Sequence, residues 1–161
     1  MIRLAAAVLA GLLISDPFRA PTEHLRHYRV YINEDIPADE QADIRAAEAE
    51  WLAGIPSLRF YPAPSCDYAD ICIFVSYELP KGTLGVTTMS RGVPGGAIEI
   101  DGMTILPGAF QAIAAHELGH AMGLEHGPPG SVMCRSINCG AWHVTPQDVQ
   151  SWYEVRGWRK P

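Results

Sequence analysis

Three histidines and a glutamate hold fixed positions in the stretch HELGHAMGLEH, and this spacing constrains the chain more than any other feature. His116 and His120 are four residues apart, so on a helix their imidazole rings share one face and can reach a single metal ion. Glu117 lies about 100° around such a helix, where its carboxylate can reach a water molecule held by that ion. A left-handed backbone at Gly123 would end the helix and turn the chain, which allows His126 to return as a third ligand.

This set of side chains favours a catalytic zinc site. Three neutral imidazoles leave one tetrahedral position for water, zinc lowers the pKa of that water, and a carboxylate can then accept its proton. The helix is apolar on its other faces, and burying two unpaired histidines there is costly unless they bind a metal. We therefore predict zinc ligands at His116, His120 and His126 and a general base at Glu117. The alternative is a helix that carries surface histidines by chance, and the five fixed positions of the pattern argue against it.

Composition favours one globular domain. The chain has 161 residues, of which 48% are hydrophobic and 19% charged, and this length is sufficient to bury a core. The net charge is −6 and no run of basic residues occurs, so nucleic acid is a poor candidate for a partner.

The hydrophobic pattern predicts an α+β domain. Alternating or β-branched segments predict strands at 27–33, 58–61, 70–77, 84–89 and 97–101. Helical spacing predicts helices at 37–52 and 110–124, the second with a gap at Gly123. A last helix is expected to start at Thr145, which can cap it, with Pro146 at the first helical position and Asp148 in the first turn.

The N-terminal residues resemble a secretory signal. An unbroken apolar run of eleven residues follows Arg3. A helix of that length spans about 16 Å, which is too short for a hydrocarbon core of about 30 Å. We expect a signal peptide over residues 1–20 and a mature, extracytoplasmic domain over residues 21–161. The alternative is a helix that packs on the domain.

The four cysteines are consistent with export. An even number in an exported chain favours two disulfides, and four cysteines allow three pairings. We expect the local pairs Cys66–Cys72 and Cys134–Cys139. Four reduced thiols are the alternative, whereas a four-cysteine zinc site lacks the two-residue spacing of zinc knuckles.

With these features in place, the chain resembles the metzincin peptidases, and within them most closely the matrixin-type catalytic domain. The resemblance covers residues 25–157. Met133, seven residues after His126, matches the methionine-bearing turn that metzincins place beneath their zinc. The other matching segments are 29–33, 44–60, the Gly-Gly-led strand 95–101, and Ala114-Ala115 with the histidine motif that follows.

The resemblance implies a zincin-like fold with a mixed, twisted five-stranded sheet, three helices, an active-site helix and a Met-turn. It implies a zinc endopeptidase whose ligands are His116, His120 and His126, with Glu117 as general base. A protein or peptide substrate would lie extended along the edge strand at 84–89. Arg135 or His143 is a candidate for additional oxyanion stabilisation. We expect a secreted monomer with one catalytic zinc and no membrane span.

Two positions and one segment depart from the family pattern. Glu99 stands where the animal enzymes place a histidine ligand for a second, structural zinc, and Arg135 stands where some metzincins carry a tyrosine. Residues 15–26 contain no cysteine that could plug the zinc in the manner of a propeptide. Asp101 could contribute to a calcium site, although the sequence shows no complete set of calcium ligands.

Two other functions use the same motif. A zinc-binding module without turnover would retain the histidines, but it would have no need of the general base at Glu117. Amidase-type cleavage of cell-wall peptides would use the same chemistry as proteolysis, and the sequence does not separate the two.

Overall fold

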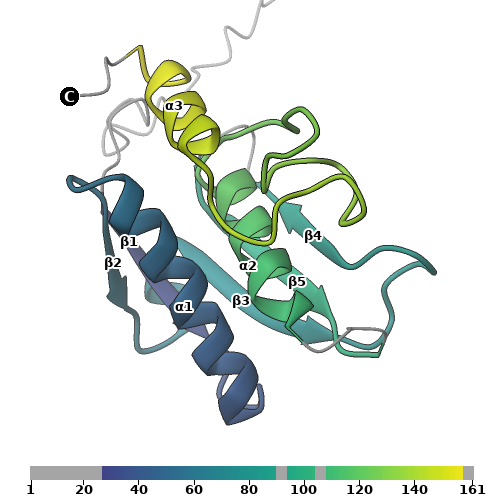
Figure 1. Ribbon diagram of the computed structural model, residues 1–161. Helices are drawn as coiled ribbons and strands as arrows, with labels where there is room; N and C mark the ends of the chain where they lie inside the picture. The colour runs from purple at the N-terminus through teal and green to yellow at the C-terminus, as the bar shows by residue number, and fades with distance from the viewer. Residues whose placement is uncertain (1–26, 90–93, 104–107, 158–161) are drawn as a thin grey trace, which may run out of the picture.

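The sheet places its single antiparallel strand at one edge, beside the histidine-bearing helix (Figure 1). The computed structural model describes residues 27–89, 94–103 and 108–157. The strand order is β2-β1-β3-β5-β4, in which β4 alone runs antiparallel, to β5. This confirms the mixed five-stranded sheet. The strands are β1 (His27–Ile32), β2 (Arg59–Pro62), β3 (Ile71–Ser76), β4 (Gly85–Thr88) and β5 (Gly96–Asp101).

Three helices complete the α+β architecture: α1 (Ala38–Gly54), α2 (Ala109–Ala121) and α3 (Pro146–Glu154). Figure 1 shows α1 and α2 side by side across one face of the sheet. A short 3-10 turn, η2 (Cys66–Tyr68), was not predicted. The prediction that the second helix reaches residue 124 was wrong, because α2 ends at Ala121 and the backbone reverses at Gly123. The predicted strand at 58–61 extends to Pro62, which sits on an edge strand where its missing N–H is tolerated.

The core lies between the sheet and the pair α1 and α2. Strand residues such as Tyr28 and Ile98 are fully buried, and so is Trp51 of α1. The Trp51 indole N–H donates a hydrogen bond of 3.0 Å to the Ala115 carbonyl, one residue before His116. Core packing therefore fixes the position of the helix that carries the histidine motif.

The predicted start of α3 is confirmed. Thr145 and Asp148 form a capping box, in which the Thr145 hydroxyl accepts from the Asp148 N–H and the Asp148 carboxylate accepts from the Thr145 N–H. Pro146 occupies the first helical turn. A methyl group added at Gly54 would collide with Val149, so α3 packs closely against the end of α1.

Both local disulfides are present. Cys66–Cys72 joins η2 to β3, and Cys134–Cys139 closes a loop beyond the histidine motif, with Cα atoms 5.4 Å and 6.0 Å apart respectively. None of the described helices is long and apolar enough to cross a membrane. The signal peptide expected over residues 1–20 lies outside the described residues.

A buried arginine connects three elements near the end of α2. The Arg156 guanidinium donates to the Tyr28 hydroxyl at 3.0 Å, to the Met122 carbonyl at 2.7 Å and to the Trp152 carbonyl at 3.0 Å. It also lies 4.0 Å from the centre of the Trp152 ring, within range of a cation–π interaction. Burial disfavours the charged form and lowers the pKa of Arg156, while the neighbouring Tyr28 raises it.

Replacing this guanidinium should destabilise the fold. We expect Arg156→Met to lower the free energy of unfolding by about 3 kcal/mol, because it leaves buried oxygen acceptors without donors. Arg156→Lys keeps the charge but loses the forked geometry, so its loss should be smaller. Urea unfolding monitored by tryptophan fluorescence measures both. The exposed Arg59→Gln is the control, and an equal loss in that variant would contradict the role given to Arg156.

Candidate metal-binding and catalytic site

The structure brings the three predicted histidines together. His116 and His120 extend from α2, and their Nε2 atoms are 3.0 Å apart. His126 follows from the loop after the helix, with its ring centre 5.4 Å from that of His116 and 4.7 Å from that of His120. One nitrogen from each ring lies within 4.8 Å of the other two. This arrangement lets all three side chains bind one ion.

The turn that returns His126 has the predicted left-handed residue. Gly123 has a φ of 91°, a conformation that side-chain-bearing residues rarely adopt. The Gly123 N–H donates to the His120 carbonyl at 2.8 Å, and the Leu124 N–H donates to the Gly119 carbonyl at 2.9 Å. These bonds close the end of α2 and reverse the chain.

Backbone carbonyls fix which nitrogen of each helical histidine carries the proton. His116 Nδ1 donates to the Val132 carbonyl at 2.7 Å, and His120 Nδ1 donates to the Leu124 carbonyl at 2.8 Å. A carbonyl oxygen can only accept, so each Nδ1 carries the hydrogen and each neutral ring turns an Nε2 lone pair toward the other. Two lone pairs 3.0 Å apart repel each other unless a cation lies against both. The donor set therefore fits a metal ion.

Burial supports the neutral form of these two rings. It lowers the pKa of both His116 and His120, although the hydrogen bonds to Val132 and Leu124 oppose that shift. A neutral imidazole is the form that binds a metal ion.

Glu117 lies next to the histidines and is held by the edge strand. Its carboxylate is almost fully buried, and Thr87 of β4 donates to it from Oγ1 at 2.6 Å. Burial raises the pKa of Glu117, while the bond from Thr87 and the charge of His120 lower it, and the net shift is upward. A raised pKa makes the carboxylate a better proton acceptor at neutral pH. The sequence did not indicate that Thr87 orients this group.

Two glycines provide space around these side chains. A methyl group at Gly85 would lie 2.6 Å from the nearer Glu117 oxygen, so β4 can approach the carboxylate only because residue 85 has no side chain. A methyl group at Gly119 would collide with the sulfur of the buried Met133 and come within 3.2 Å of the Trp51 ring. Met133 therefore packs directly against α2 at the turn between His116 and His120.

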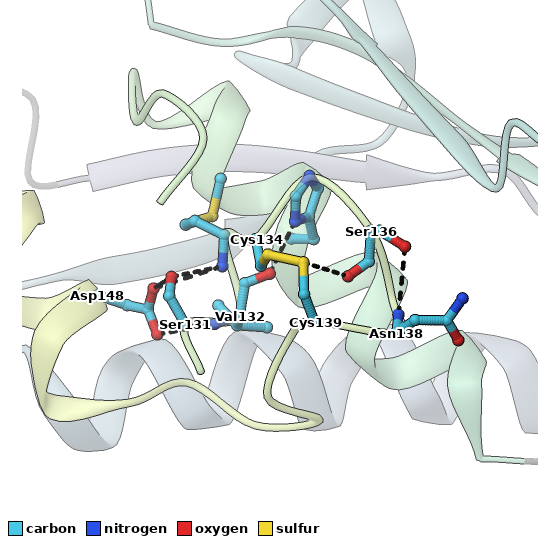
Figure 2. The surroundings of a disulfide bond; sticks show 9 residues. Ser131, Val132, Cys134, Ser136, Asn138, Cys139 and Asp148 are labelled. Carbon is cyan, nitrogen blue, oxygen red and sulfur yellow. Dashed lines mark hydrogen bonds between the residues drawn. A yellow bond between two sulfur atoms is a disulfide. The ribbon is translucent and has the colours of Figure 1, made fainter. Parts of the chain in front are cut away.

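A buried carboxylate, which sequence reasoning assigned only to the helix start, organises the turn around Met133. Asp148 accepts hydrogen bonds from the Ser131 hydroxyl, from the Val132 N–H at 3.1 Å and from the Met133 N–H at 3.4 Å (Figure 2). The same Val132 accepts from His116 through its carbonyl. Asp148 thereby positions the residue that holds the first histidine. The sequence carried no signal for this role because the contact spans 16 residues.

The site opens into a cavity of about 790 Å³ between β4, α2 and the loop after Met133. The three histidines and Glu117 line it, and so does Arg135. His143, the other candidate for oxyanion stabilisation, does not line it. Its Nδ1 instead lies 2.6 Å from the Glu50 carboxylate of α1.

Within the described residues, the histidine triad is the one cluster of metal-ligating side chains. Glu99 lies in β5 opposite Val86 and Phe74, and Asp101 accepts a hydrogen bond from the Met103 N–H at 3.0 Å. Neither residue belongs to a second such cluster in the part of the chain that the structure describes.

Asp148 gives a prediction for stability. Burial raises its pKa, but the hydrogen bonds from Ser131, Thr145 and Val132 outweigh burial and hold the pKa below the ordinary value of 3.8. A lowered pKa in the folded state stabilises the fold above pH 3.8, and this contribution is lost as the pH falls through the folded value. We expect Asp148→Asn to lower the unfolding free energy at pH 7 by about 3 kcal/mol.

Urea unfolding at a series of pH values measures this effect, and the difference between wild type and Asp148→Asn should narrow below pH 3.8. Asp67→Asn is the control, because Asp67 is exposed on η2. A difference that is the same at every pH would show that the charge of Asp148 contributes nothing.

A comparison with protein-family models and with curated proteins finds no match to this chain, so its function has to be inferred from the site itself.

Proposed function

We propose that this chain is a zinc-dependent endopeptidase with a metzincin catalytic domain of the matrixin type. The observation that carries the proposal is the convergence of three histidine nitrogens within 4.8 Å, with a carboxylate on the same cavity. The position of Met133 against α2, between two of those histidines, supports the metzincin assignment because that family is defined by a methionine turn beneath its zinc.

The chain's own residues supply the remaining parts of a hydrolytic site. His116, His120 and His126 would hold the zinc ion. When bound, zinc supplies Lewis-acid chemistry, which acidifies water and polarises a carbonyl. Glu117 accepts a proton from the attacking water and donates it to the leaving amine nitrogen, and the hydroxyl of Thr87 keeps its carboxylate oriented.

The edge strand favours a polypeptide substrate. β4 is the last strand in the sheet order, so one row of its backbone N–H and C=O groups has no strand partner within the described residues. Three of its residues, Gly85, Val86 and Thr87, line the cavity. An extended peptide can pair with this edge and place a peptide bond beside Glu117.

Export is part of the proposal. Two disulfides form over short sequence separations, and disulfides persist mainly in oxidising compartments outside the cytoplasm. The two disulfides are therefore consistent with a secreted or otherwise extracytoplasmic enzyme.

The general base gives the first test. Glu117→Gln should lower the rate of casein cleavage by at least about 100-fold, because an amide cannot accept the proton. Zinc content per chain, measured by mass spectrometry, should be unchanged. Glu125→Gln is the matched control, since Glu125 lies in the same motif but is exposed and does not line the cavity.

The same assay run on cell-wall peptides identifies the substrate class. Cleavage of casein by the wild type alone supports an endopeptidase, whereas cleavage of cell-wall peptides alone supports an amidase of that class. A wild type that binds zinc and cleaves neither substrate would contradict the enzyme proposal.

The ligand set gives the second test. Purified wild type should hold one zinc per chain, and His126→Ala should weaken zinc binding by at least about tenfold, because it removes a ligand at an exposed position where the fold tolerates the change. His143→Ala is the control, because His143 is exposed and lies outside the cavity. Competition with a chromogenic chelator measures the affinities. Equal affinity in wild type and His126→Ala would show that residue 126 is not a ligand.

A further inference from the structure

The cavity is lined by one positively charged residue, Arg135, among those that the structure describes. Arg135 is exposed and is the only lysine or arginine among the described residues that line this cavity. No hydrogen bond or ion pair to another described residue engages its guanidinium in the structure. Glu117 carries the one carboxylate among the described lining residues, and that carboxylate already accepts a hydrogen bond from Thr87. Arg135 therefore has its charge available for a ligand.

The loop that carries Arg135 is held in place on both sides. Cys134 and Cys139 form a disulfide that closes residues 134–139, here called the disulfide loop (Figure 2). The Ser136 carbonyl accepts from the Cys139 N–H at 3.0 Å within the loop and from the N–H of Gly140, the residue that follows it, at 3.1 Å. Cys134 is buried and directly follows Met133 of the site.

This construction fixes the backbone of Arg135 relative to the histidines. A guanidinium on a rigid loop loses less conformational freedom on binding than one on a mobile loop. The chain as a whole carries a net charge of −6, so a positive charge at the cavity is opposite in sign to the protein's net charge. This positive charge would favour an anionic group there. A guanidinium matches the geometry of a carboxylate, which it can bind through two parallel hydrogen bonds.

We propose that Arg135 is a specificity-determining residue that binds a carboxylate of the peptide substrate. The inference rests on the proposed function, because it assumes that a peptide occupies the cavity. The carboxylate belongs either to an acidic side chain or to the peptide C-terminus, since both present the same chemistry to the guanidinium.

A role in oxyanion stabilisation makes a different prediction. An arginine that stabilises the oxyanion acts on every peptide alike, so its loss lowers kcat for all of them. An arginine that binds a substrate carboxylate affects only peptides that carry this group.

The experiment uses octapeptides in which a single Glu is moved along an otherwise neutral sequence. Each is paired with the matching Gln peptide and made with a free or an amidated C-terminus. Because Arg135 is exposed, wild type should favour the acidic member by about two- to fivefold in kcat/KM, with a smaller preference at high salt. Arg135→Gln should abolish the preference, Arg135→Lys should retain part of it, and Arg135→Glu should reverse it in favour of the neutral Gln peptides. Arg59→Gln, on the opposite edge strand, is the control and should leave it unchanged.

The pattern of preference identifies the source of the carboxylate. A preference that depends on the Glu position assigns it to a side chain, and one that depends only on the free terminus assigns it to the C-terminus. Equal cleavage of acidic and neutral peptides would overturn the proposal. So would a preference that survives in Arg135→Gln, or an equal loss of kcat on all peptides.

Binding separates this proposal from the proposed function. The same peptides, fluorescently labelled, are titrated against Glu117→Gln and against the double variant Glu117→Gln/Arg135→Gln. A carboxylate preference in the single variant that the double variant lacks supports the role of Arg135, even if wild type cleaves none of the peptides. Binding of none of the peptides overturns it, and cleavage without any preference leaves the endopeptidase standing while removing Arg135 as its specificity residue.

Discussion

The hydrogen bonds from two imidazole Nδ1 atoms to backbone carbonyls are the constraint on which the site depends. They commit His116 and His120 to one tautomer and turn two Nε2 lone pairs toward the same point. The peptide units on both sides of Val132, whose carbonyl receives one of these bonds, donate their N–H groups to the buried carboxylate of Asp148. The position of His116 on α2 is thus coupled to α3, although the two helices are separated in the sequence by a long loop. Burying a charged carboxylate is costly unless hydrogen-bond donors surround it. Asp148 accepts hydrogen bonds from Ser131, Val132, Met133 and Thr145.

Close packing around α2 explains two glycines near the histidines, one in the histidine motif and one in β4. Gly119 lies where any side chain would strike Met133 or Trp51, and Gly85 lies where any side chain would strike the Glu117 carboxylate. At Gly119 the absence of a side chain lets Met133 and Trp51 pack against α2, and at Gly85 it lets β4 approach the Glu117 carboxylate. The Met133 turn supports the helix on one side, and β4 holds the carboxylate on the other. His116 and His120 therefore lie among packed elements, while all three histidines line the cavity.

The two walls of the cavity differ in the groups that they offer to a ligand. On one side, β4 presents unpaired backbone groups at the edge of the sheet, which suits recognition of any extended chain. On the other side, the disulfide loop contributes Arg135 to the lining from a covalently closed segment. If the proposed function holds, the first wall would supply affinity that is independent of sequence and the second would supply selectivity. Both walls meet at the histidines, because β4 and the loop flank α2.

The sequence alone determined the α+β class, the spacing that brings the three histidines together and both local disulfides. Each of these rests on short-range patterns: the four-residue spacing of His116 and His120, the left-handed turn at Gly123, and cysteines separated by five or six positions. Only the tertiary structure decided that Thr87 orients Glu117 and that His143 turns to Glu50 instead of the cavity. The two residues of the first contact are 30 positions apart in the sequence, and those of the second are 93 positions apart. No periodicity reports such a contact, because it exists only once the sheet and the helices have packed against each other.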